Sequence, residues 1–290
     1  MKPARFDYYL PATLDEALDA LHELGDDVKV LAGGQSLVPM LNMRLAQPAA
    51  LLDINALREL DTITRENGAL RVGATVRQGT LERSPEALSE VPLLAQALPL
   101  IGHWQTRNRG TLCGSLAHAD PSAELPLLLT VLGGSVEVRS TRGSRTVAAG
   151  DLFASYFTTA LEPDELIVTA NLPLARPRRR YAFQEFAQRH GDFALAAVAC
   201  AVELDESGRI SHLALALGGA GEMPLLVETA DMLGTELTAA AVATLAERAW
   251  AGCDPPNDHH ASAAFRRQLV RTLTSRMLTA FAQPQEQLVR

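Results

Sequence analysis

The stretch Leu31-Ala32-Gly33-Gly34-Gln35-Ser36 decides how the first half of the chain is expected to fold. It follows a short apolar run, Val28–Leu31, that is typical of a buried strand, and it precedes Leu37–Leu45, where a short helix is expected. Glycine permits unusual backbone angles and leaves room for another group, so that several main-chain N–H groups can point at one anion. The pattern therefore indicates either a loop that binds a diphosphate or an ordinary strand-to-helix turn.

This loop does not match the common nucleotide-binding fingerprints. The pattern G-x-G-x-x-G does not follow the strand, and G-x-x-x-x-G-K-[ST] does not occur in the sequence. A Rossmann domain and a P-loop are therefore disfavoured, and a dinucleotide bound at this loop requires a different fold.

A second segment with similar chemistry is Asn108–Ser115, for which a loop is expected. It contains two glycines, Gly110 and Gly114, together with hydroxyl side chains and Arg109, whose guanidinium can hold a phosphate with two hydrogen bonds. Taken alone, this segment is also compatible with an ordinary turn. Two such segments, each after an apolar run, favour one anion shared between them.

His118, Asp120 and Glu124 follow the second segment. A histidine near an aspartate can serve acid–base chemistry. Asp120 also fits the cap of a helix that begins at Pro121 and runs through Leu132, because aspartate and proline favour these two positions. Both interpretations stay open at this point, and Glu124, one turn into that helix, is placed to hydrogen-bond a ligand hydroxyl.

Composition argues against several classes of protein. The 290 residues include 26 basic and 34 acidic ones, so the net charge is −8, which argues against nucleic-acid binding. No apolar run reaches the roughly 20 residues that are needed to span a bilayer. Residues 1–25 are mixed in character and carry several acids, unlike a signal peptide. We therefore expect a cytoplasmic protein with no membrane span.

The three cysteines, Cys113, Cys200 and Cys253, lie far apart and form no C-x-x-C pair. A disulfide framework is not expected, and three thiols are too few for the four ligands of an all-cysteine iron–sulfur cluster. The scattered histidines predict no metal site. Redox chemistry in this chain would require an organic cofactor.

The rest of the sequence predicts helices and antiparallel hairpins. Thr13 with Glu16 three residues later is a capping box, and Asn67-Gly68 and Arg142-Gly143 fit hairpin turns between apolar runs. After residues 174–180, rich in proline and arginine, strand-like runs come first and helical ones last, which favours an α+β fold over a doubly wound sheet. The expected strands are 181–186, 193–204 and 210–217, followed by helices near 228–233, 239–251 and 261–281.

The two glycine-containing segments also carry a resemblance to a known family. Ala32–Pro39 together with Arg109–Ser115 closely resembles the FAD-binding medium subunit of molybdenum hydroxylases, in the carbon monoxide dehydrogenase and xanthine dehydrogenase family. Gln105–Arg109, His118–Pro126 and Gly191–Ala194 fit the same family in order and spacing. The likeness covers nearly the whole chain.

The resemblance implies an α+β protein of two domains. Residues 1–176 would form an FAD-binding domain of the vanillyl-alcohol-oxidase (PCMH) type with two subdomains. Residues 177–290 would form a C-terminal domain like that of the carbon monoxide dehydrogenase flavoprotein, with a short antiparallel sheet packed against helices.

The resemblance also assigns residues to FAD, and it assigns none to catalysis or to a metal. The first loop would hold the diphosphate from one side, the second would close from the other, and residues elsewhere would contact other parts of the cofactor. The expected FAD contacts are Leu31, Ala32, Gly33, Gly34, Gln35, Ser36, Leu37, Ile101, Arg109, Thr111, Cys113, Gly114, Ser115, Asp120, Glu124 and Ile167.

The chain departs from the family pattern at two places. Many relatives have Gly-Gly where this chain has Cys113-Gly114, which would put a small thiol beside the cofactor. Relatives also often carry a lysine that approaches the flavin ring near the position of Gln184 or Glu185, and neither residue is basic in this chain. Both differences bear on how the protein would tune the flavin.

The activity implied by the resemblance is electron transfer. A large subunit with molybdopterin would hydroxylate the substrate, a small subunit would carry two [2Fe–2S] clusters, and FAD on this chain would pass electrons to an external acceptor. The complex is expected to be a dimer of such heterotrimers. Two alternatives remain open: a stand-alone flavin oxidase or reductase of the same fold superfamily, and a structural protein that has lost its flavin.

Overall fold

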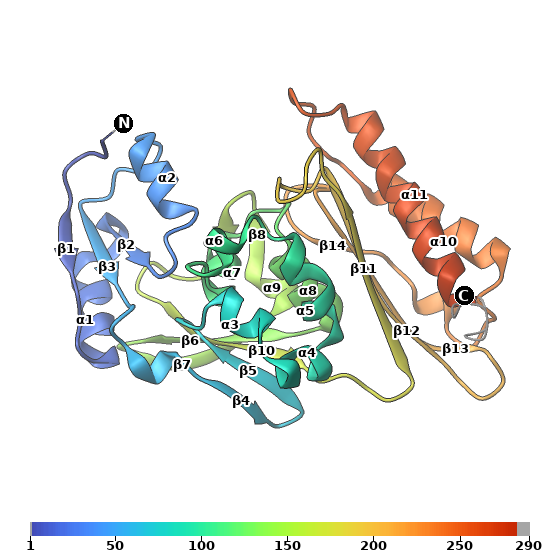
Figure 1. The fold of residues 1–290 in the computed structure, drawn as a ribbon, viewed down its shortest axis with the longest axis horizontal. Coiled ribbons are helices and arrows are strands. Elements are labelled where there is room, and N and C mark those ends of the chain that lie inside the picture. The colour runs from blue at the N-terminus through green and yellow to red at the C-terminus, as the bar shows by residue number, and fades with distance from the viewer. Residues whose placement is uncertain (1, 283–290) are drawn as a thin grey trace. The chain divides into compact units, whose positions relative to one another are not determined.

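The computed structural model describes residues 2–282 and divides them into two compact units (Figure 1). The first unit comprises the residues up to Ala87, His103–Ala119 and Gly133–Leu174. The second comprises Leu88–Gly102, Asp120–Leu132 and the residues from Ala175 onward. The chain therefore passes back and forth between the units, and the division into domains at residues 176 and 177 stays a prediction.

The first unit begins with a three-stranded parallel sheet in the order β1-β3-β2, formed by β1 (Asp7–Tyr9), β3 (Ala50–Asp53) and β2 (Val28–Leu31). Parallel strands need a crossover connection, and helix α1 (Leu14–Leu24) lies between β1 and β2 in the chain. The predicted cap is confirmed, because Thr13 accepts a hydrogen bond from the N–H of Glu16. The Glu16 carboxylate accepts from Ala12 N–H, one residue before the position that a regular capping box uses.

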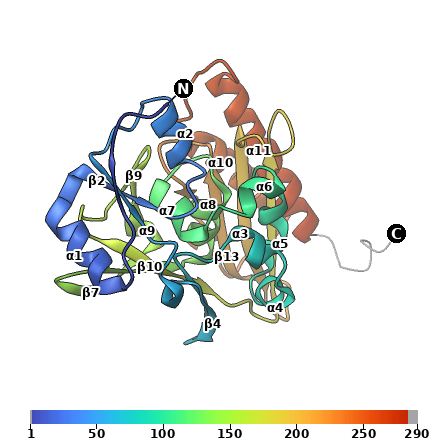
Figure 2. The ribbon, with the colours of Figure 1, turned by 60° about the vertical axis from the view of Figure 1, so that its left-hand side comes forward.

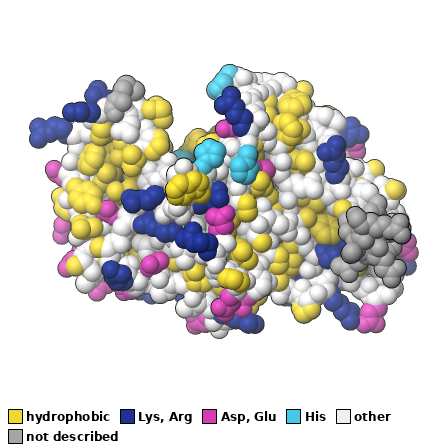
Figure 3. Space-filling view, viewed as in Figure 1, with side chains coloured by type: hydrophobic (Ala, Val, Ile, Leu, Met, Phe, Trp, Pro, Cys, Tyr) yellow, Lys and Arg dark blue, Asp and Glu magenta, His cyan; other side chains and the backbone are white. Residues whose placement is uncertain are grey.

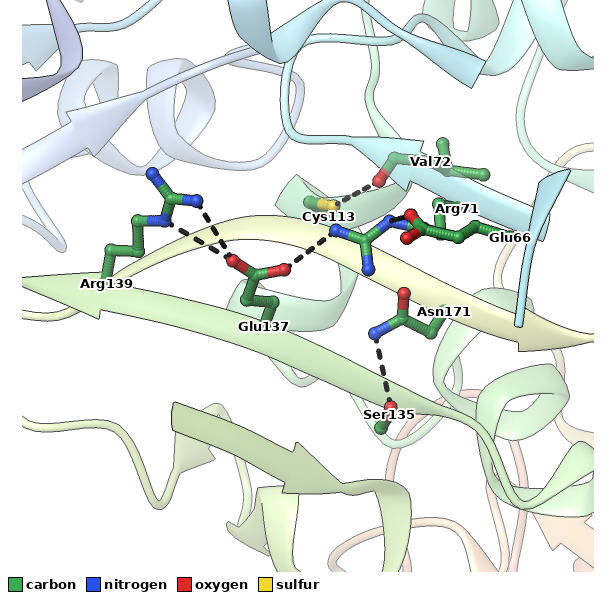
Figure 4. Close-up of polar contacts among 8 residues, drawn as sticks. All are labelled: Glu66, Arg71, Val72, Cys113, Ser135, Glu137, Arg139 and Asn171. Atoms are coloured by element: carbon green, nitrogen blue, oxygen red, sulfur yellow. Dashed lines mark hydrogen bonds and ion pairs between the residues drawn. The ribbon is translucent and has the colours of Figure 1, made fainter. Parts of the chain in front are cut away.

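The larger sheet of the first unit is antiparallel, in the order β4-β5-β10-β6-β7. Its first hairpin turns at Asn67 and Gly68, whose φ angles are 51° and 76°, as the Asn-Gly pair predicts. The second predicted hairpin, closed by Gly143, is also confirmed. Figure 4 shows Arg71 on β5 reaching across β10 to Glu137 on β6, at 2.8 Å between side-chain nitrogen and oxygen. The strands are β4 (Ile63–Glu66), β5 (Ala69–Gly73), β10 (Leu166–Pro173), β6 (Ser135–Ser140) and β7 (Gly143–Ala148).

Short elements complete the first unit. Helix α7 packs against β5 and β10, so the second glycine-containing segment rests on the larger sheet. The short elements are α2 (Leu37–Asn42), α3 (Gln78–Glu82), α6 (Trp104–Arg107), α7 (Leu112–His118), α9 (Ala149–Leu152), β8 (Phe153–Ser155), β9 (Thr158–Thr159) and the 3₁₀ turns Gly25–Asp27 and Arg58–Leu60, with α4 (Pro85–Glu90) shared between the units.

The second unit is built on a four-stranded antiparallel sheet, β11-β12-β13-β14. Side chains alternate along a strand, so each face of this sheet has its own composition. One face carries larger side chains such as Val198 and Leu215, which belong to the same core as residues of helices α10 and α11. The elements are β11 (Arg179–Phe186), β12 (Ala196–Leu204), β13 (Ile210–Gly218), β14 (Leu225–Leu226), the 3₁₀ turn Ala230–Met232, α10 (Ala239–Gly252) and α11 (Ala263–Ala282).

The opposite face of this sheet carries small side chains and is covered by two helices from earlier in the chain. Ala197 pairs with Gly218, and Ala199 pairs with Ala216. Helices α5 (Pro92–Ala97) and α8 (Glu124–Leu132) contact this sheet (Figures 1 and 2), and the 3₁₀ turn Leu98–Leu100 directly follows α5. A Cβ on Gly218 would lie 3.1 Å from Cδ2 of Leu127, so the small residues let α8 approach the sheet closely.

Some predicted boundaries are wrong. The helix expected from Pro121 begins at Glu124, because Asp120 accepts from Ser122 N–H and forms a tight turn instead of a helix cap. The helix expected near 228–233 is only the 3₁₀ turn Ala230–Met232. The strand expected from residue 193 begins at Ala196. The predicted α+β character is confirmed by the sheets and helices of both units.

The surface agrees with the mixed charge of the sequence. On the face shown in Figure 3, acidic and basic side chains stand among hydrophobic ones. Among the residues that the structure describes, no helix combines the length and the apolar character that crossing a bilayer demands.

Leu127→Ala tests the packing of α8 on the sheet of the second unit. The side chain is fully buried, so its truncation should lower the free energy of unfolding by about 2–5 kcal/mol through lost burial and a residual cavity. Urea unfolding measures the change. Leu233→Ala is the control, because Leu233 is 49% exposed and its truncation should have a small effect. Equal losses in the two variants would contradict this packing.

Candidate functional site

The first glycine loop leaves its main-chain donors unused by the protein. Gly34 has a φ of 69°, which favours glycine, and the predicted helix follows as α2. Within residues 2–282, no acceptor is found for the main-chain N–H groups of Gly33, Gly34, Gln35 and Ser36. Main-chain donors in partly buried loops are normally paired. Consecutive free donors are what a bound anion needs.

The two glycine-containing segments lie directly against each other. A Cβ on Gly33 would be 2.5 Å from the carbonyl oxygen of Arg109 and 2.6 Å from Cα of Gly110, much closer than the ~3.5–4.0 Å of a normal contact. A Cβ on Gly114 would lie 4.0 Å from Cβ of Ala32. The structure therefore brings the predicted loops together. It also gives Gly33 a more specific role than expected, because this glycine lets two backbones meet.

The sequence predicted a loop over Asn108–Ser115, but this segment is only partly a loop. Leu112–His118 form helix α7, and Thr111 caps it by accepting from the N–H of Gly114 at 3.0 Å. A Cβ on Gly114 would lie 2.7 Å from the Thr111 hydroxyl oxygen, so this glycine leaves room for the cap. The chain thus changes from an irregular segment to a helix within the predicted site.

Cys113 contributes to the core and not to the surface of the site. Its thiol is 2% exposed and donates to the carbonyl of Val72 on β5 (Figure 4). Burial raises the pKa of this thiol to about 12. The thiol therefore points into the core of the first unit, and the expectation of a thiol beside the cofactor stays a prediction.

The other predicted FAD contacts in the first unit differ in their exposure and hydrogen bonding. Gln35 folds back and donates to the carbonyl of Gly33 at 3.0 Å. Leu31 and Leu37 are partly buried at the two ends of the first loop, and Ser115 is partly buried on α7. Arg109 is exposed, and Ile167 is buried on β10.

The acid–base interpretation of His118 gains no support from the structure. The His118 ring lies 5.2 Å from the ring of Phe157, centre to centre. Phe157 has a φ of 52° and donates from its N–H to the carbonyl of Ala119, which is also left-handed. His118 ends α7 in the first unit, whereas Asp120 begins a segment of the second.

The sequence did not predict the residues that hydrogen-bond to the main chain of the second segment and hold it in place. Gln78 is 5% exposed, and its N–H donates to the carbonyl of Gly110 at 2.8 Å. Its side-chain amide donates to the carbonyl of Thr111 at 3.3 Å. Asn55 and Arg77 contact the carbonyls of Ala32 and Arg109 in a similar way. These contacts join positions far apart in the sequence, and no local motif marks them.

The predicted residues Ile101, Asp120 and Glu124 belong to the second unit. Glu124 is the first residue of α8 and is 5% exposed. Burial raises the pKa of Glu124 to about 8, and the carboxylates of Glu185 and Asp120 raise it further. Burial also raises the pKa of Glu185 to about 7. At neutral pH, Glu124 therefore holds a proton and can donate a hydrogen bond as well as accept one.

Comparison with known families identifies the family of this chain. Residues 4–175 match the FAD binding domain in molybdopterin dehydrogenase, and residues 181–281 match the CO dehydrogenase flavoprotein C-terminal domain. The chain belongs to the FAD-binding medium subunits of the molybdenum hydroxylases. The resemblance seen in the sequence is thus confirmed, and the cofactor of this medium subunit is FAD.

Relatives and solved structures support the same family over the whole length. The medium subunit is 39% identical to the 6-hydroxypseudooxynicotine dehydrogenase complex subunit alpha of Paenarthrobacter nicotinovorans, covering 96% of this chain and 95% of the relative. Carbon monoxide dehydrogenase from Hydrogenophaga pseudoflava, in a form lacking the Mo-pyranopterin moiety, has a chain with a TM-score of 0.93 at 35% identity, with 97% and 98% of the chains covered. Quinoline 2-oxidoreductase from Pseudomonas putida 86 gives a TM-score of 0.91 at 36% identity, with 98% and 99% covered.

These relatives favour a subunit of a multi-chain dehydrogenase over a stand-alone flavin oxidase. The 6-hydroxypseudooxynicotine dehydrogenase relative is named as a complex subunit, and a carbon monoxide dehydrogenase relative from Hydrogenophaga pseudoflava is named as a medium chain. Both match this medium subunit nearly from end to end. The chain is therefore part of an oxidoreductase, which also argues against a structural protein without flavin.

The raised pKa of Glu124 predicts how stability depends on pH. Between pH 4.5, its ordinary pKa, and about 8, the folded chain keeps a proton that the unfolded chain releases. The free energy of unfolding should therefore fall as pH rises through this window, by up to about 1.4 kcal/mol per pH unit for one proton. Glu124→Gln cannot ionise and should lose this slope.

Urea unfolding of the wild type and Glu124→Gln from pH 5 to above pH 8 measures the difference. The stability gained by the variant should grow with pH and level off near the folded pKa of about 8. Glu206→Gln serves as the control, since Glu206 is exposed and should leave the pH dependence unchanged. Parallel curves for the wild type and Glu124→Gln would show that Glu124 ionises normally.

Proposed function

We propose that this medium subunit holds the FAD diphosphate between residues 31–37 and residues 109–115 and relays electrons within a larger enzyme. The observation that carries the proposal is the row of main-chain donors at Gly33–Ser36, beside a second glycine-containing segment in backbone contact. A diphosphate is a compact anion that accepts several such hydrogen bonds at once. The residues present therefore fit the group.

Each loop has a distinct task in this proposal. Gly33 and Gly34 present N–H groups without side chains in the way, and Ser36 and Gln35 add polar side chains. Thr111 uses its hydroxyl to hold the start of α7, so the second segment keeps a fixed shape before the cofactor arrives. Such preorganisation reduces the entropy lost on binding.

The remaining predicted residues would contact other parts of FAD. Protonated Glu124 would donate a hydrogen bond to a ligand hydroxyl, and Asp120 would accept one. Ile101 and Ile167 would offer apolar contacts. FAD, when bound, supplies a redox group that takes electrons from [2Fe–2S] clusters of a partner subunit and passes them to an external acceptor. The protein's own part is to bind and orient the cofactor.

The proposed complex contains a large molybdopterin-binding subunit and a small [2Fe–2S] subunit, in a dimer of heterotrimers. The names "medium chain" and "complex subunit alpha" of two relatives support partner chains. We place the complex in the cytoplasm, and the three buried free cysteines, Cys113, Cys200 and Cys253, are consistent with a reducing compartment.

Gly33→Val tests the diphosphate site. The new side chain would collide with the backbone of Arg109 and separate the two loops, so the purified chain should retain little or no FAD. Visible flavin absorbance per chain measures retention. Gly150→Ala is the matched control in the same unit, because a Cβ at Gly150 meets nothing within 4 Å. Normal FAD content in Gly33→Val would contradict the proposed site.

Affinity purification of the tagged chain from its source tests the proposed complex. We expect two further subunits to co-purify, together with molybdenum and iron measured by elemental analysis. Size-exclusion chromatography with light scattering then distinguishes one heterotrimer from two. Recovery of the flavoprotein alone, turning over a substrate without partners, would contradict the relay function.

A further inference from the structure

The side chain of Asn55 is fixed just after β3, beneath the first loop. Its Nδ2 donates to the carbonyl of Ala32 at 2.9 Å and to Oδ1 of Asp53 at 2.6 Å. The same Asp53 oxygen accepts from the main-chain N–H of Asn55 at 2.9 Å. The other carboxylate oxygen of Asp53 accepts from the hydroxyl of Tyr8 on β1. The strands of the small sheet therefore hold this amide in place.

The partners of Asn55 also determine which way its amide points. Two acceptors, Ala32 O and Asp53 Oδ1, face one end of the amide, so that end must carry the NH₂ group. The opposite end faces the guanidinium of Arg77, which donates to Oδ1. Reversing the amide would place oxygen against oxygen and nitrogen against a cation, so only one orientation satisfies all the groups.

Arg77 continues this contact to the second segment. One of its terminal nitrogens donates to Asn55, and the other donates to the carbonyl of Arg109 at 2.6 Å. The next residue, Gln78, donates from its N–H to the carbonyl of Gly110, so main chain and side chain hold the same stretch. A planar guanidinium suits two acceptors at once, and the shorter reach and single nitrogen of lysine do not.

These two side chains supply the polar connection between the loops. Within the described part of the chain, no hydrogen bond runs directly from residues 32–36 to residues 109–115, although Gly33 touches Arg109 and Gly110. The path from Ala32 O through Asn55 and Arg77 to Arg109 O is continuous. It sets the distance between loops that would otherwise only touch.

The same path aims a donor at the ligand. In a trans peptide the N–H points opposite to the preceding C=O. Asn55 holds the carbonyl of Ala32, and therefore directs the N–H of Gly33 away from the clamp. Gly33 N–H is one of the donors without a protein acceptor.

We propose that Asn55 and Arg77 form a positioning clamp that fixes the spacing of the two glycine-containing segments and aims Gly33 N–H at the FAD diphosphate. The proposal rests on the proposed function in one respect, namely that these segments hold that diphosphate. Neither side chain needs to touch the cofactor. Their effect is carried by the carbonyls of Ala32 and Arg109.

Asn55→Leu, Arg77→Met and the double variant test the clamp in the full-length chain. Each single change should weaken FAD binding on the order of tenfold to a hundredfold, the range for a lost hydrogen bond to a charged or preorganised group. The double variant should be little worse than either single one, because both changes break the same path. Fluorescence titration of the flavin gives the dissociation constants, and additive losses would overturn the clamp.

Hydrogen exchange of the chain without FAD gives a readout that does not depend on binding. Asn55 contacts only the first loop directly, so Asn55→Leu should speed exchange in residues 104–116 only if Arg77 transmits the change. Asn55→Ala is the smaller variant in case leucine disturbs folding. It breaks the same path without placing a second carboxylate against Asp53, and it should speed exchange in residues 104–116 as Asn55→Leu does.

Arg71→Met is the matched control, because Arg71 is also a part-buried arginine of the first unit and contacts Glu66 and Glu137 instead of the loops. It should change neither FAD affinity nor exchange at residues 104–116. Unchanged exchange there in Asn55→Leu overturns the clamp whether or not FAD binds. A wild-type chain that binds no FAD, with exchange transmitted as expected, would instead overturn the proposed function and leave the clamp standing.

Discussion

The close approach of two backbones at Gly33 is the constraint on which the rest of the site depends. The first loop can reach Arg109 and Gly110 only because residue 33 lacks a side chain. This approach brings the free main-chain donors of the first loop against the second segment. Glycine is therefore needed at position 33 mainly because it has no side chain, and less because of its conformational freedom. Other features of the site, including the threonine cap of α7 and the buried side chain of Gln78, hold the segments that meet at this contact.

The protein separates the holding of a redox group from the chemistry of a substrate. Its ionisable residues near the loops are engaged in structure: Arg77 bridges two segments, and the thiol of Cys113 is buried and protonated. Glu124 and Glu185 share an apolar environment in the second unit, which favours their neutral forms. A subunit built in this way suits a relay, because few of its own groups are free to react with a substrate or with water.

The sequence predicted the local elements and the paired loops well, for physical reasons that are themselves local. Asn67-Gly68 specifies its turn through two left-handed residues, and Thr13 specifies a cap through one hydroxyl. The Asn55–Arg77 contacts were not predictable, because they join residues whose proximity exists only after the sheets form. The direction of the Cys113 thiol was missed for the same reason. Its position on α7 over β5 decides that it faces the core.

The membership of α5 and α8 in the second unit was also invisible in the sequence, since apolar periodicity shows that a helix has a buried face but not which sheet covers it. These helices pack on strands that come much later in the chain. During synthesis, both helices therefore emerge before the surface that they cover exists, with leucines such as Leu127 still exposed. Folding of the second unit must wait for β12 and β13, which makes its contacts long-range and its assembly slow. Until β13, which ends at Gly218, has been translated, these exposed leucines leave the nascent chain prone to aggregation.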